Sequence, residues 1–416
     1  MAAAASLSIN DADQVLRPPT DGLEYLRQDQ AAELTAEPGS VHAHNGRIGG
    51  FERAEDAGLQ IDGRGCAVIP GLVDCHTHLP FAGWREREYA LKISGASYES
   101  IARGGGGIRS SAHALVNATD AEVLGQASAL TNEMLAHGTT LFECKSGYGL
   151  SREGELRAIS LAAKLAQHAE QPLRSTALLA HAVPEGYDAD GWMDAVEAML
   201  PDVLAGGEVS ALDIYVESVA FSNEHLKRMG ALAAKHRLDL RAHVEQFNTN
   251  RSVPVAVEAG ARSVDHLACL PAEHVALLAS AQTAAVLLPG AEFLGAERVA
   301  PARELADAGA ICVVATDLNP GTSPVLSLPL IIGLAVRRYR WSVLEALLAC
   351  TLNAAWVLRR SRDTGSLELG KRADLVVLDE PIERIPYRFG HNPVAFVFIA
   401  GRLVHARMDC RWRLTT

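Results

Sequence analysis

The sequence predicts an α/β protein, a (β/α)8 TIM-like barrel with a small β-sandwich domain built from both termini. Eight short apolar runs alternate with longer amphipathic segments between about residues 68 and 317, which is typical of parallel strands and their crossover helices. The stretches before and after this alternation are instead rich in short strand patterns and glycine turns. A chain of 416 residues is long enough for a barrel of about 250 residues and a small second unit.

Barrel strands are expected where apolar residues run without polar alternation, because such strands are buried on both faces. The eight runs are Val68–Asp74, Thr139–Cys144, Ser175–His181, Leu212–Glu217, Leu238–His243, Ser263–His266, Ala284–Pro289 and Ile311–Thr316. Helical periodicity between them is found in Ala121–His137, Gly154–His168, Asn223–His236 and Pro301–Gly309. The long stretch Pro80–Thr119 breaks the alternation, and we expect it to cover the substrate.

Short strands separated by glycine turns are predicted at both ends of the chain. They lie in Arg47–Gly50 and Leu59–Val68, and again in Asp374–Leu378 and Val394–Val404, where Gly401-Arg402 is a hairpin turn. We therefore expect residues 1–67 and 365–416 to form one composite small β domain, beside a barrel over residues 68–364.

Composition limits the classes of partner. The net charge of −12 disfavours nucleic acid and anionic membranes, and no apolar run approaches the roughly 18 residues that span a bilayer. A small-molecule substrate, even an anionic one, is compatible with this charge because a local arginine can override it. The seven cysteines are scattered and form no CxxC pair, which favours buried thiols in a reducing compartment. The N-terminus shows no signal peptide, so we expect a cytoplasmic protein.

The apolar run Pro70–Asp74 leads into a His-x-His pair, His76 and His78. Residues i and i+2 of a strand face the same side, so the two imidazoles can converge on one cation. Neutral imidazole suits zinc and divalent iron, and two such groups are half of an open catalytic site. The pair His42 and His44 has the same spacing without an apolar run before it, and we interpret it as surface.

Further histidines and one aspartate end other apolar runs. His181 ends the third run, His243 the fifth and His266 the sixth, and Asp317 follows the eighth. In a parallel barrel such strand ends meet at one mouth, where catalytic residues lie. A single histidine at a strand end is more often a satisfied core or rim residue, but the whole set favours a metal-dependent hydrolase.

Longer motifs around these residues carry a specific resemblance. The segments are Pro70–Gly83, Gly105–Ile108, Glu143–Leu150, His181–Pro184, His243–Gln246, Asp265–Leu267 and Ala315–Pro324. In these motifs the chain resembles the amidohydrolase superfamily and, within it, the imidazolonepropionase family of histidine degradation. The Lys-Ser-Gly-Tyr-Gly and Asn-Pro-Gly-Thr-Ser-Pro pieces are far more discriminating than the His-x-His pair.

The resemblance implies one divalent or trivalent metal ion, zinc or iron, with His76, His78, His243 and Asp317 as its ligands. Three imidazoles and a carboxylate leave room for a water, whose pKa a bound cation lowers toward about 7. Superfamily members with two metals place a bridging carboxylated lysine on the fourth strand. The fourth run here, Leu212–Glu217, has no lysine, so one metal is expected.

The resemblance also implies how the reaction runs. Water acidified by the cation attacks a lactam carbonyl, and Asp317 accepts its proton and relays it to the leaving ring nitrogen. His266 and His181 are both candidates to polarise the carbonyl. Gln246 lies three residues after His243 and is expected to orient the water or the ring by hydrogen bonds, because an amide cannot act as a base.

A substrate that bears a propionate needs a cationic or hydroxyl-rich clamp. By resemblance, Arg85 supplies a bidentate fork and Tyr148 a phenol. Asn319, Gly321 and Thr322 are expected to line the pocket with side-chain and backbone donors. Without the motif, Arg85 would be interpreted as a solvated side chain in a charged stretch, and the turn after Asp317 as an ordinary loop.

The expected activity is metal-dependent hydrolysis of the cyclic amide of 4-imidazolone-5-propanoate to N-formimidoyl-L-glutamate. An alternative is another amidohydrolase, an aminohydrolase or cyclic amidase, acting on a related carboxylate-bearing heterocycle. A non-catalytic binding protein on the same barrel is disfavoured, because none of the four implied ligands is missing. A homodimer is expected for this class. Trp84 and Gly290–Arg298 depart from the family pattern and bear on substrate preference rather than on the metal.

Overall fold

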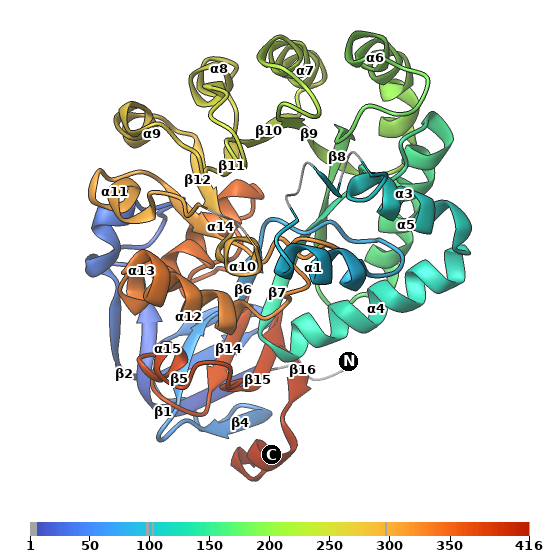
Figure 1. Ribbon diagram of the computed structural model, residues 1–416. Helices are drawn as coiled ribbons and strands as arrows, with labels where there is room; N and C mark the ends of the chain where they lie inside the picture. The colour runs from blue at the N-terminus through green and yellow to red at the C-terminus, as the bar shows by residue number, and fades with distance from the viewer. Residues whose placement is uncertain (1–5, 97–99, 102–103, 296–297, 416) are drawn as a thin grey trace.

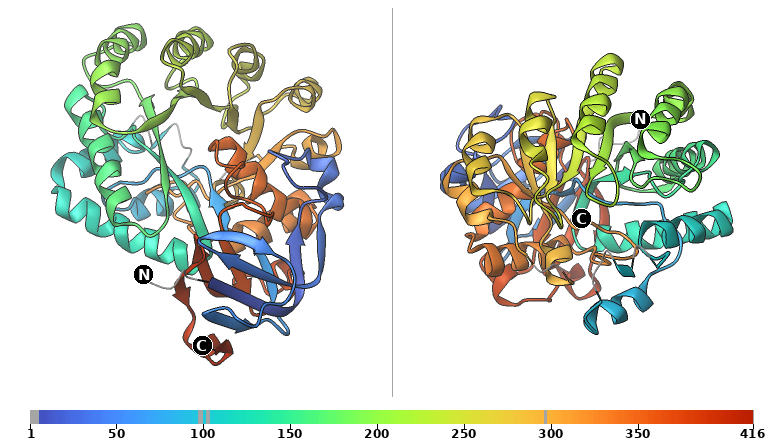
Figure 2. Two further views of the ribbon diagram at one scale, coloured as in Figure 1. Left: turned by 180° about the vertical axis from the view of Figure 1, so that it is seen from behind. Right: turned by 45° about the horizontal axis from the view of Figure 1, so that its top comes forward.

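The computed structural model describes residues 6–96, 100–101, 104–295 and 298–415 (Figure 1). Its strands lie in an eight-stranded and a nine-stranded sheet. The first is built from consecutive strands, whereas the second takes strands from both ends of the chain. Figure 2 shows the blue N-terminal strands and the red C-terminal strands side by side next to the barrel. The predicted fold class, α/β with a (β/α)8 barrel, is confirmed.

The barrel sheet runs in sequence order, and all its neighbouring strands are parallel. Its strands are β6 (Leu72–Asp74), β7 (Thr139–Lys145), β8 (Leu173–Ala180), β9 (Val209–Val216), β10 (Asp239–Val244), β11 (Ser263–His266), β12 (Ala284–Leu287) and β13 (Cys312–Val314). The first and last strands meet just beyond their ends, where Thr77 forms a parallel bridge to Leu318. The His78 N–H also donates to the Leu318 carbonyl at 2.9 Å. This contact brings His78 and Asp317 to the same side of the barrel mouth.

Helices outside the barrel connect the strands, and some begin at residues that cap them. Thr119 and Glu122 form a capping box at the start of α4 (Asp120–Ala136), and the Ser151 hydroxyl accepts from the Gly154 N–H at the start of α5 (Arg152–His168). The other helices around the barrel are α1 (Glu86–Ile93), α3 (Ile108–Asn117), α6 (Ala189–Gly206), α7 (Asn223–His236), α8 (Ser252–Glu258), η2 (Ala272–His274), α9 (Val275–Ser280), α10 (Pro289–Phe293), α11 (Ala302–Asp307), α12 (Leu328–Tyr339), α13 (Val343–Ala349) and α14 (Leu352–Val357).

The nine-stranded sheet has the order β16-β15-β14-β5-β1-β2-β3, with β4 beside β1 and β17 beside β4. Its strands are β1 (Ser6–Arg17), β2 (Thr35–His44), β3 (Arg47–Gly50), β4 (Leu59–Asp62), β5 (Ala67–Pro70), β14 (Leu375–Leu378), β15 (Val394–Ile399), β16 (Arg402–Ala406) and β17 (Leu414–Thr415). The short helices η1 (Gln28–Glu33), α15 (Arg384–Tyr387) and η3 (Met408–Arg413) complete the described elements. The sequence patterns do not predict β1, because polar but buried residues such as Ser8 and Asn10 interrupt its apolar run. His42 and His44 lie on β2, in this sheet rather than at the barrel mouth, and His44 is exposed.

The prediction of Val68–Asp74 as a single barrel strand is wrong. The first part, β5, pairs antiparallel with β14 in the nine-stranded sheet, and only β6 pairs with β7 in the barrel. Gly71 separates the two parts, and its N–H donates to the Asp374 carbonyl at 2.9 Å. A Cβ at Gly71 would lie 2.1 Å from Thr140 Oγ1, so a side chain there would displace the neighbouring strand. The backbone thus ties the two sheets together just before His76.

Two expectations drawn from composition agree with the structure. The seven cysteines are free and buried. Within the described ranges, no helix combines the length and the apolar character needed to cross a bilayer.

The division into a composite domain over residues 1–67 and 365–416 and a barrel over residues 68–364 stays a prediction. One strand of the predicted barrel range, β5, lies in the sheet formed by the termini.

Candidate active site

The carboxyl ends of the barrel strands surround a cavity of about 360 Å³. Its lining residues are His78, Arg85, Ile108, Tyr148, His181, Tyr215, His243, Gln246, His266, Asp317, Asn319 and Thr322. All but two of the predicted site residues are in this set. Of these two, His76 is fully buried against the rings of neighbouring histidines, and Gly321 lies against the Arg85 guanidinium.

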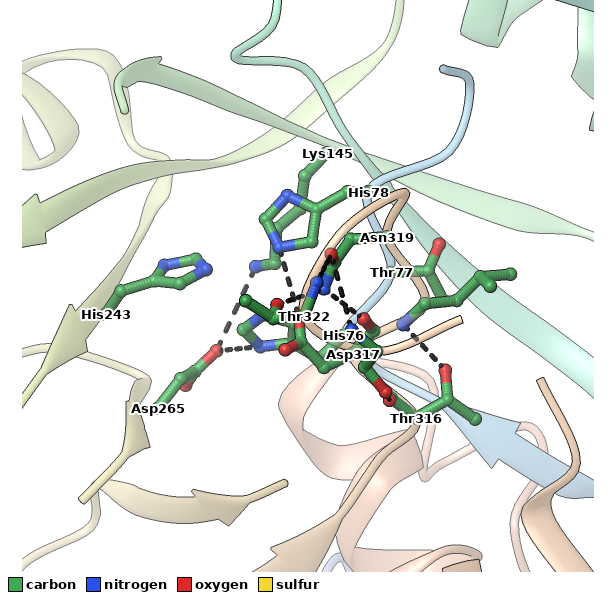
Figure 3. A network of polar contacts seen from close by, with 12 residues as sticks. His76, Thr77, His78, Lys145, His243, Asp265, Thr316, Asp317, Asn319 and Thr322 are labelled. Carbon is green, nitrogen blue, oxygen red and sulfur yellow. Dashed lines mark hydrogen bonds and ion pairs between the residues drawn. The ribbon is translucent and has the colours of Figure 1, made fainter. Parts of the chain in front are cut away.

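Imidazoles and one carboxylate gather at this cavity (Figure 3). The ligand atoms of His76, His78 and His243 lie within 4.8 Å of one another, and so do those of His76, His266 and Asp317. Asp317 Oδ1 is 3.3 Å from His78 Nε2 and 3.5 Å from His76 Nε2. The fold therefore brings together the four implied metal ligands, which follow β6 and β13 or lie on β10.

Four polar atoms of this cluster are buried without a hydrogen-bond partner among the described residues. They are His76 Nε2, His78 Nδ1, His243 Nε2 and Asp317 Oδ2. Leaving a buried polar atom unpaired costs about 1–3 kcal/mol, so four of them in one cluster indicate a missing partner. Imidazole nitrogens and a carboxylate oxygen are donors that zinc and divalent iron prefer. The residues present therefore fit a metal ion.

Two carboxylates fix the orientation of the ligand imidazoles. Asp265 Oδ2 lies 2.6 Å from His76 Nδ1, and Asp213 Oδ1 lies 3.0 Å from His243 Nδ1. Each Nδ1–H donates to its carboxylate, which leaves the Nε2 lone pair for a cation. Burial, followed by the charge of Lys145, lowers the pKa of His76 well below its usual value, so that ring is neutral at physiological pH.

His181 and His266 flank the cluster and differ in their partners. His181 Nδ1 lies 3.0 Å from the Gly147 carbonyl oxygen, so it donates there and keeps a lone pair on Nε2. Its ring stacks on His78, with centroids 5.3 Å apart and an interplanar angle of 17°. Burial lowers the pKa of His266 to about 3, and its side chain makes no hydrogen bond within the described part of the chain. A neutral His181 held in this way is an acceptor at Nε2, whereas His266 is free to donate.

Arg85 is buried, with only 8% of its surface exposed, so the interpretation of a solvated arginine is wrong. Its guanidinium lies directly against Gly321, where a Cβ would come within 1.6 Å of Nη2. Nε and Nη1 have no hydrogen-bond partner in the residues that the structure describes, and Glu88 Oε2 is 3.7 Å from Nε. The arginine therefore offers unused donors beside the cavity.

Asn319 organises the loop that follows β13. Its side-chain oxygen accepts from the N–H groups of Gly321 at 2.8 Å and Thr322 at 2.7 Å. Its amide group donates to the Asp317 carbonyl at 2.6 Å and to the Thr322 hydroxyl at 2.8 Å. Asn319 thus shapes the loop on which Thr322 lines the cavity.

Glu155 holds the turn that carries Tyr148. This buried carboxylate accepts from the N–H groups of Gly147 at 3.0 Å, Gly149 at 2.8 Å and Leu150 at 3.1 Å. The Gly147 carbonyl in turn accepts from His181. One glutamate near the start of α5 therefore positions two residues of the cavity wall.

Three residues at this end of the barrel have a strained backbone. Asp317, His266 and Glu245 have φ angles of 54°, 83° and 54°, in the left-handed region that residues other than glycine rarely adopt. Each such residue costs about 1–3 kcal/mol, and this strain is characteristic of functional sites.

Several residues of the site have no counterpart among the sequence predictions. Ile108 and Tyr215 line the cavity. Asp213, Asp265 and Lys145 lie behind the ligand histidines, with Lys145 Nζ 2.7 Å from Asp213 Oδ2. The sequence does carry a signal for Asp213, Asp265 and Lys145. Each is a charged residue within an apolar run that is buried on both faces, and such a residue must have a partner.

Known proteins resemble the chain over most of its length. Residues 67–404 match the amidohydrolase family. The chain is 42% identical over 397 residues to an imidazolonepropionase of Herpetosiphon aurantiacus, with 91% of this chain and 93% of that protein covered. It is 40% identical to an imidazolonepropionase of Cupriavidus necator, with 94% of each covered.

Solved structures share the fold at lower sequence identity. An atrazine chlorohydrolase from Arthrobacter aurescens complexed with zinc has a TM-score of 0.72 and 17% identity, and 97% of each chain is covered. An adenosine deaminase from Xanthomonas campestris with bound zinc has a TM-score of 0.67 and 18% identity, covering 95% of this chain and 92% of its own. At these identities the likeness concerns the fold alone.

Glu155→Gln is expected to lower the free energy of unfolding by about 1–3 kcal/mol. Both carboxylate oxygens of Glu155 accept from backbone N–H groups, whereas glutamine has only one oxygen and would leave at least one of these N–H groups unpaired. Urea unfolding followed by circular dichroism measures this change. The matched control is Glu153→Gln on the same helix, whose side chain is 82% exposed and should matter by less than about 0.5 kcal/mol. Equal stability of the two variants would show that Glu155 does not hold the turn.

Proposed function

The chain belongs to the amidohydrolase family and, within it, to the imidazolonepropionases, and on this premise we propose that it hydrolyses the cyclic amide of 4-imidazolone-5-propanoate to N-formimidoyl-L-glutamate in histidine catabolism. One observation carries the proposal: a cluster of metal-binding side chains and an arginine with unused donors share a single cavity. The first suits the ring carbonyl of this substrate, and the second suits its propionate.

We assign one metal ion, zinc or iron, to His76, His78, His243 and Asp317. When bound, it would lower the pKa of a water in an open coordination position toward about 7. The assignment is supported by the unpaired Nε2 atoms of His76 and His243 and by the carboxylates behind them. The fourth barrel strand, β9, contains no lysine, so a second ion bridged by a carboxylated lysine is not expected.

We assign the propionate to Arg85, with Tyr148 and Thr322 beside it. The unpaired Nε and Nη1 atoms suit a carboxylate, and a buried guanidinium forms stronger hydrogen bonds than one in water. Gly321 contributes by its lack of a side chain, which leaves room for the guanidinium. Asn319 contributes by holding the loop. A neutral substrate of an aminohydrolase would leave Nε and Nη1 of Arg85 without a hydrogen-bond partner, which disfavours that alternative.

Asp317 is proposed as the proton carrier of the reaction. Its Oδ2 atom is buried and has no hydrogen-bond partner among the described residues, so it can accept a proton within the cavity. It would take the proton of the attacking water and deliver it to the ring nitrogen that leaves. The ring nitrogen must be protonated to depart as the neutral terminal nitrogen of the formimidoyl group.

His266 is our choice for the residue that polarises the ring carbonyl, because its neutral ring has no protein partner within the described residues and can donate to an oxyanion. His181 instead presents an acceptor at Nε2, so we place it on an N–H group of the substrate. Gln246 would orient the ring or the water by hydrogen bonds alone.

The remaining expectations are kept as proposals. A cytoplasmic location agrees with seven buried free thiols. A homodimer is proposed by resemblance to the family alone.

Asp317→Asn is expected to lower kcat by about 100- to 10 000-fold, because an amide cannot accept the water proton. Turnover of the imidazolone is measured together with metal content and circular dichroism, which separate loss of chemistry from loss of metal or fold. Asp307→Asn, at an exposed position on α11, is the matched control. Near-normal turnover by Asp317→Asn would remove its role as the base.

Arg85→Ala is expected to raise KM roughly 10- to 100-fold, because the hydrogen bonds of a charged pair are lost, with a smaller change in kcat. Steady-state kinetics with the propionate substrate measure both constants. The exposed neighbour Arg87→Ala should leave KM unchanged. If both variants had the KM of the unmodified enzyme, Arg85 would not be the carboxylate clamp.

A further inference from the structure

Lys145 ends β7 and is fully buried behind the ligand histidines. Its Nζ lies 2.7 Å from Asp213 Oδ2, 3.0 Å from Glu143 Oε2 and 3.9 Å from Asp265 Oδ2. Figure 3 shows the ammonium group joined to Asp265, which is joined in turn to His76. Lys145 has no role in the proposed reaction.

The carboxylates around Lys145 are the ones that orient the metal ligands. Asp213 uses one oxygen for Lys145 and the other for His243 Nδ1, at 2.7 and 3.0 Å. Asp265 Oδ2 accepts from His76 Nδ1 at 2.6 Å and is also within ion-pair distance of Lys145. One ammonium group therefore stands behind both carboxylate–imidazole pairs.

Lys145 is one of two cations that face three carboxylates in this network. Glu143, Asp213 and Asp265 are buried carboxylates, and Arg241 is the second cation among them, 3.0 Å from Asp265 and paired with Glu143. Burial and Arg241 act to lower the pKa of Lys145, but the three carboxylates outweigh them and raise it, so the group is an ammonium. Removal of one partner from a buried ionic network leaves an uncompensated charge, which the protein relieves by protonation or rearrangement.

An ammonium group has three donors and no lone pair, so Lys145 cannot itself bind a cation. It can act only through its partners. A carboxylate that turned away would no longer fix the tautomer of its histidine, and the Nε2 lone pair would no longer be directed to the metal.

We propose that Lys145 is a positioning residue of the metal centre, which holds Asp213, and together with Arg241 also Asp265, directed at the Nδ1 atoms of His243 and His76. The inference rests on the metal centre assigned under the proposed function. It adds that part of the affinity for the metal is set by a cation that never touches it.

The test is the affinity for zinc, measured on the full-length protein by competition with a chromogenic chelator, for the unmodified enzyme and for Lys145→Met. Methionine keeps a long unbranched side chain and removes the charge. Zinc binding by Lys145→Met is expected to be about 10- to 100-fold weaker, the usual effect of removing a partner behind a metal ligand. A purely structural ion pair would lower the thermal stability and leave the affinity for zinc unchanged.

The matched control is Lys371→Met. Lys371 is also buried and pairs with a carboxylate, Glu368 at 2.7 Å, but none of its contacts reaches the metal ligands. Loss of a buried ammonium at this position should leave the affinity for zinc unchanged. Equal zinc affinities of Lys145→Met and the unmodified enzyme would overturn the inference. Absence of zinc binding by the unmodified enzyme would instead overturn the metal centre itself, and the inference with it.

A second variant covers the case in which Lys145→Met does not fold. Asp213→Asn keeps an oxygen that can accept from His243 Nδ1 and removes the carboxylate oxygen that accepts from Lys145. If the hydrogen bond from Lys145 positions Asp213, zinc binding by this variant weakens by about tenfold or more. Unchanged affinity would overturn the inference in this case as well.

Discussion

The hydrogen bonds from the Nδ1 atoms of His76 and His243 to Asp265 and Asp213 are the interactions on which the active site depends. The two rings lie with their centroids 4.6 Å apart. The carboxylates settle which nitrogen carries the proton, and they leave the two Nε2 atoms with lone pairs available to a cation. A metal bound by this cluster would therefore owe part of its affinity to groups that lie one layer deeper in the barrel.

That deeper layer is a consequence of the parallel barrel. Side chains alternate along each strand, so every second residue points into the barrel. On β10 these residues are Arg241 and His243, and the register with β11 places them opposite Ser263 and Asp265. A position that would normally be filled by a branched apolar residue is thus filled by an ion pair. Such charges are costly to bury, and they persist where they orient other groups.

The barrel was predictable from the sequence because its strands are buried on both faces and read as continuous apolar runs. The run Val68–Asp74 was wrongly predicted as one barrel strand. Its residues are all apolar or buried, and burial alone does not distinguish a barrel strand from a strand of the second sheet that leads into it. The gathering of histidines at the barrel mouth was predictable because the carboxyl ends of the strands meet there, whereas the choice of metal ligands among them came from the resemblance. Glu155 was not, because its three partners are backbone N–H groups of a turn, which leave no trace in residue identity. Arg85 could be assigned only through the motif around it, because a charged stretch gives no sign that one of its members is buried.

The central claim is that one cavity combines a metal centre with a clamp for a propionate. The most direct measurement is the loss of imidazolone ultraviolet absorbance on addition of metal-replete protein, with a sample treated with chelator beside it. The account predicts rapid loss that the chelator abolishes and that added zinc or iron restores. Persistent absorbance with a metal-loaded, folded protein would contradict the assigned substrate, and loss that is insensitive to the chelator would contradict the metal centre.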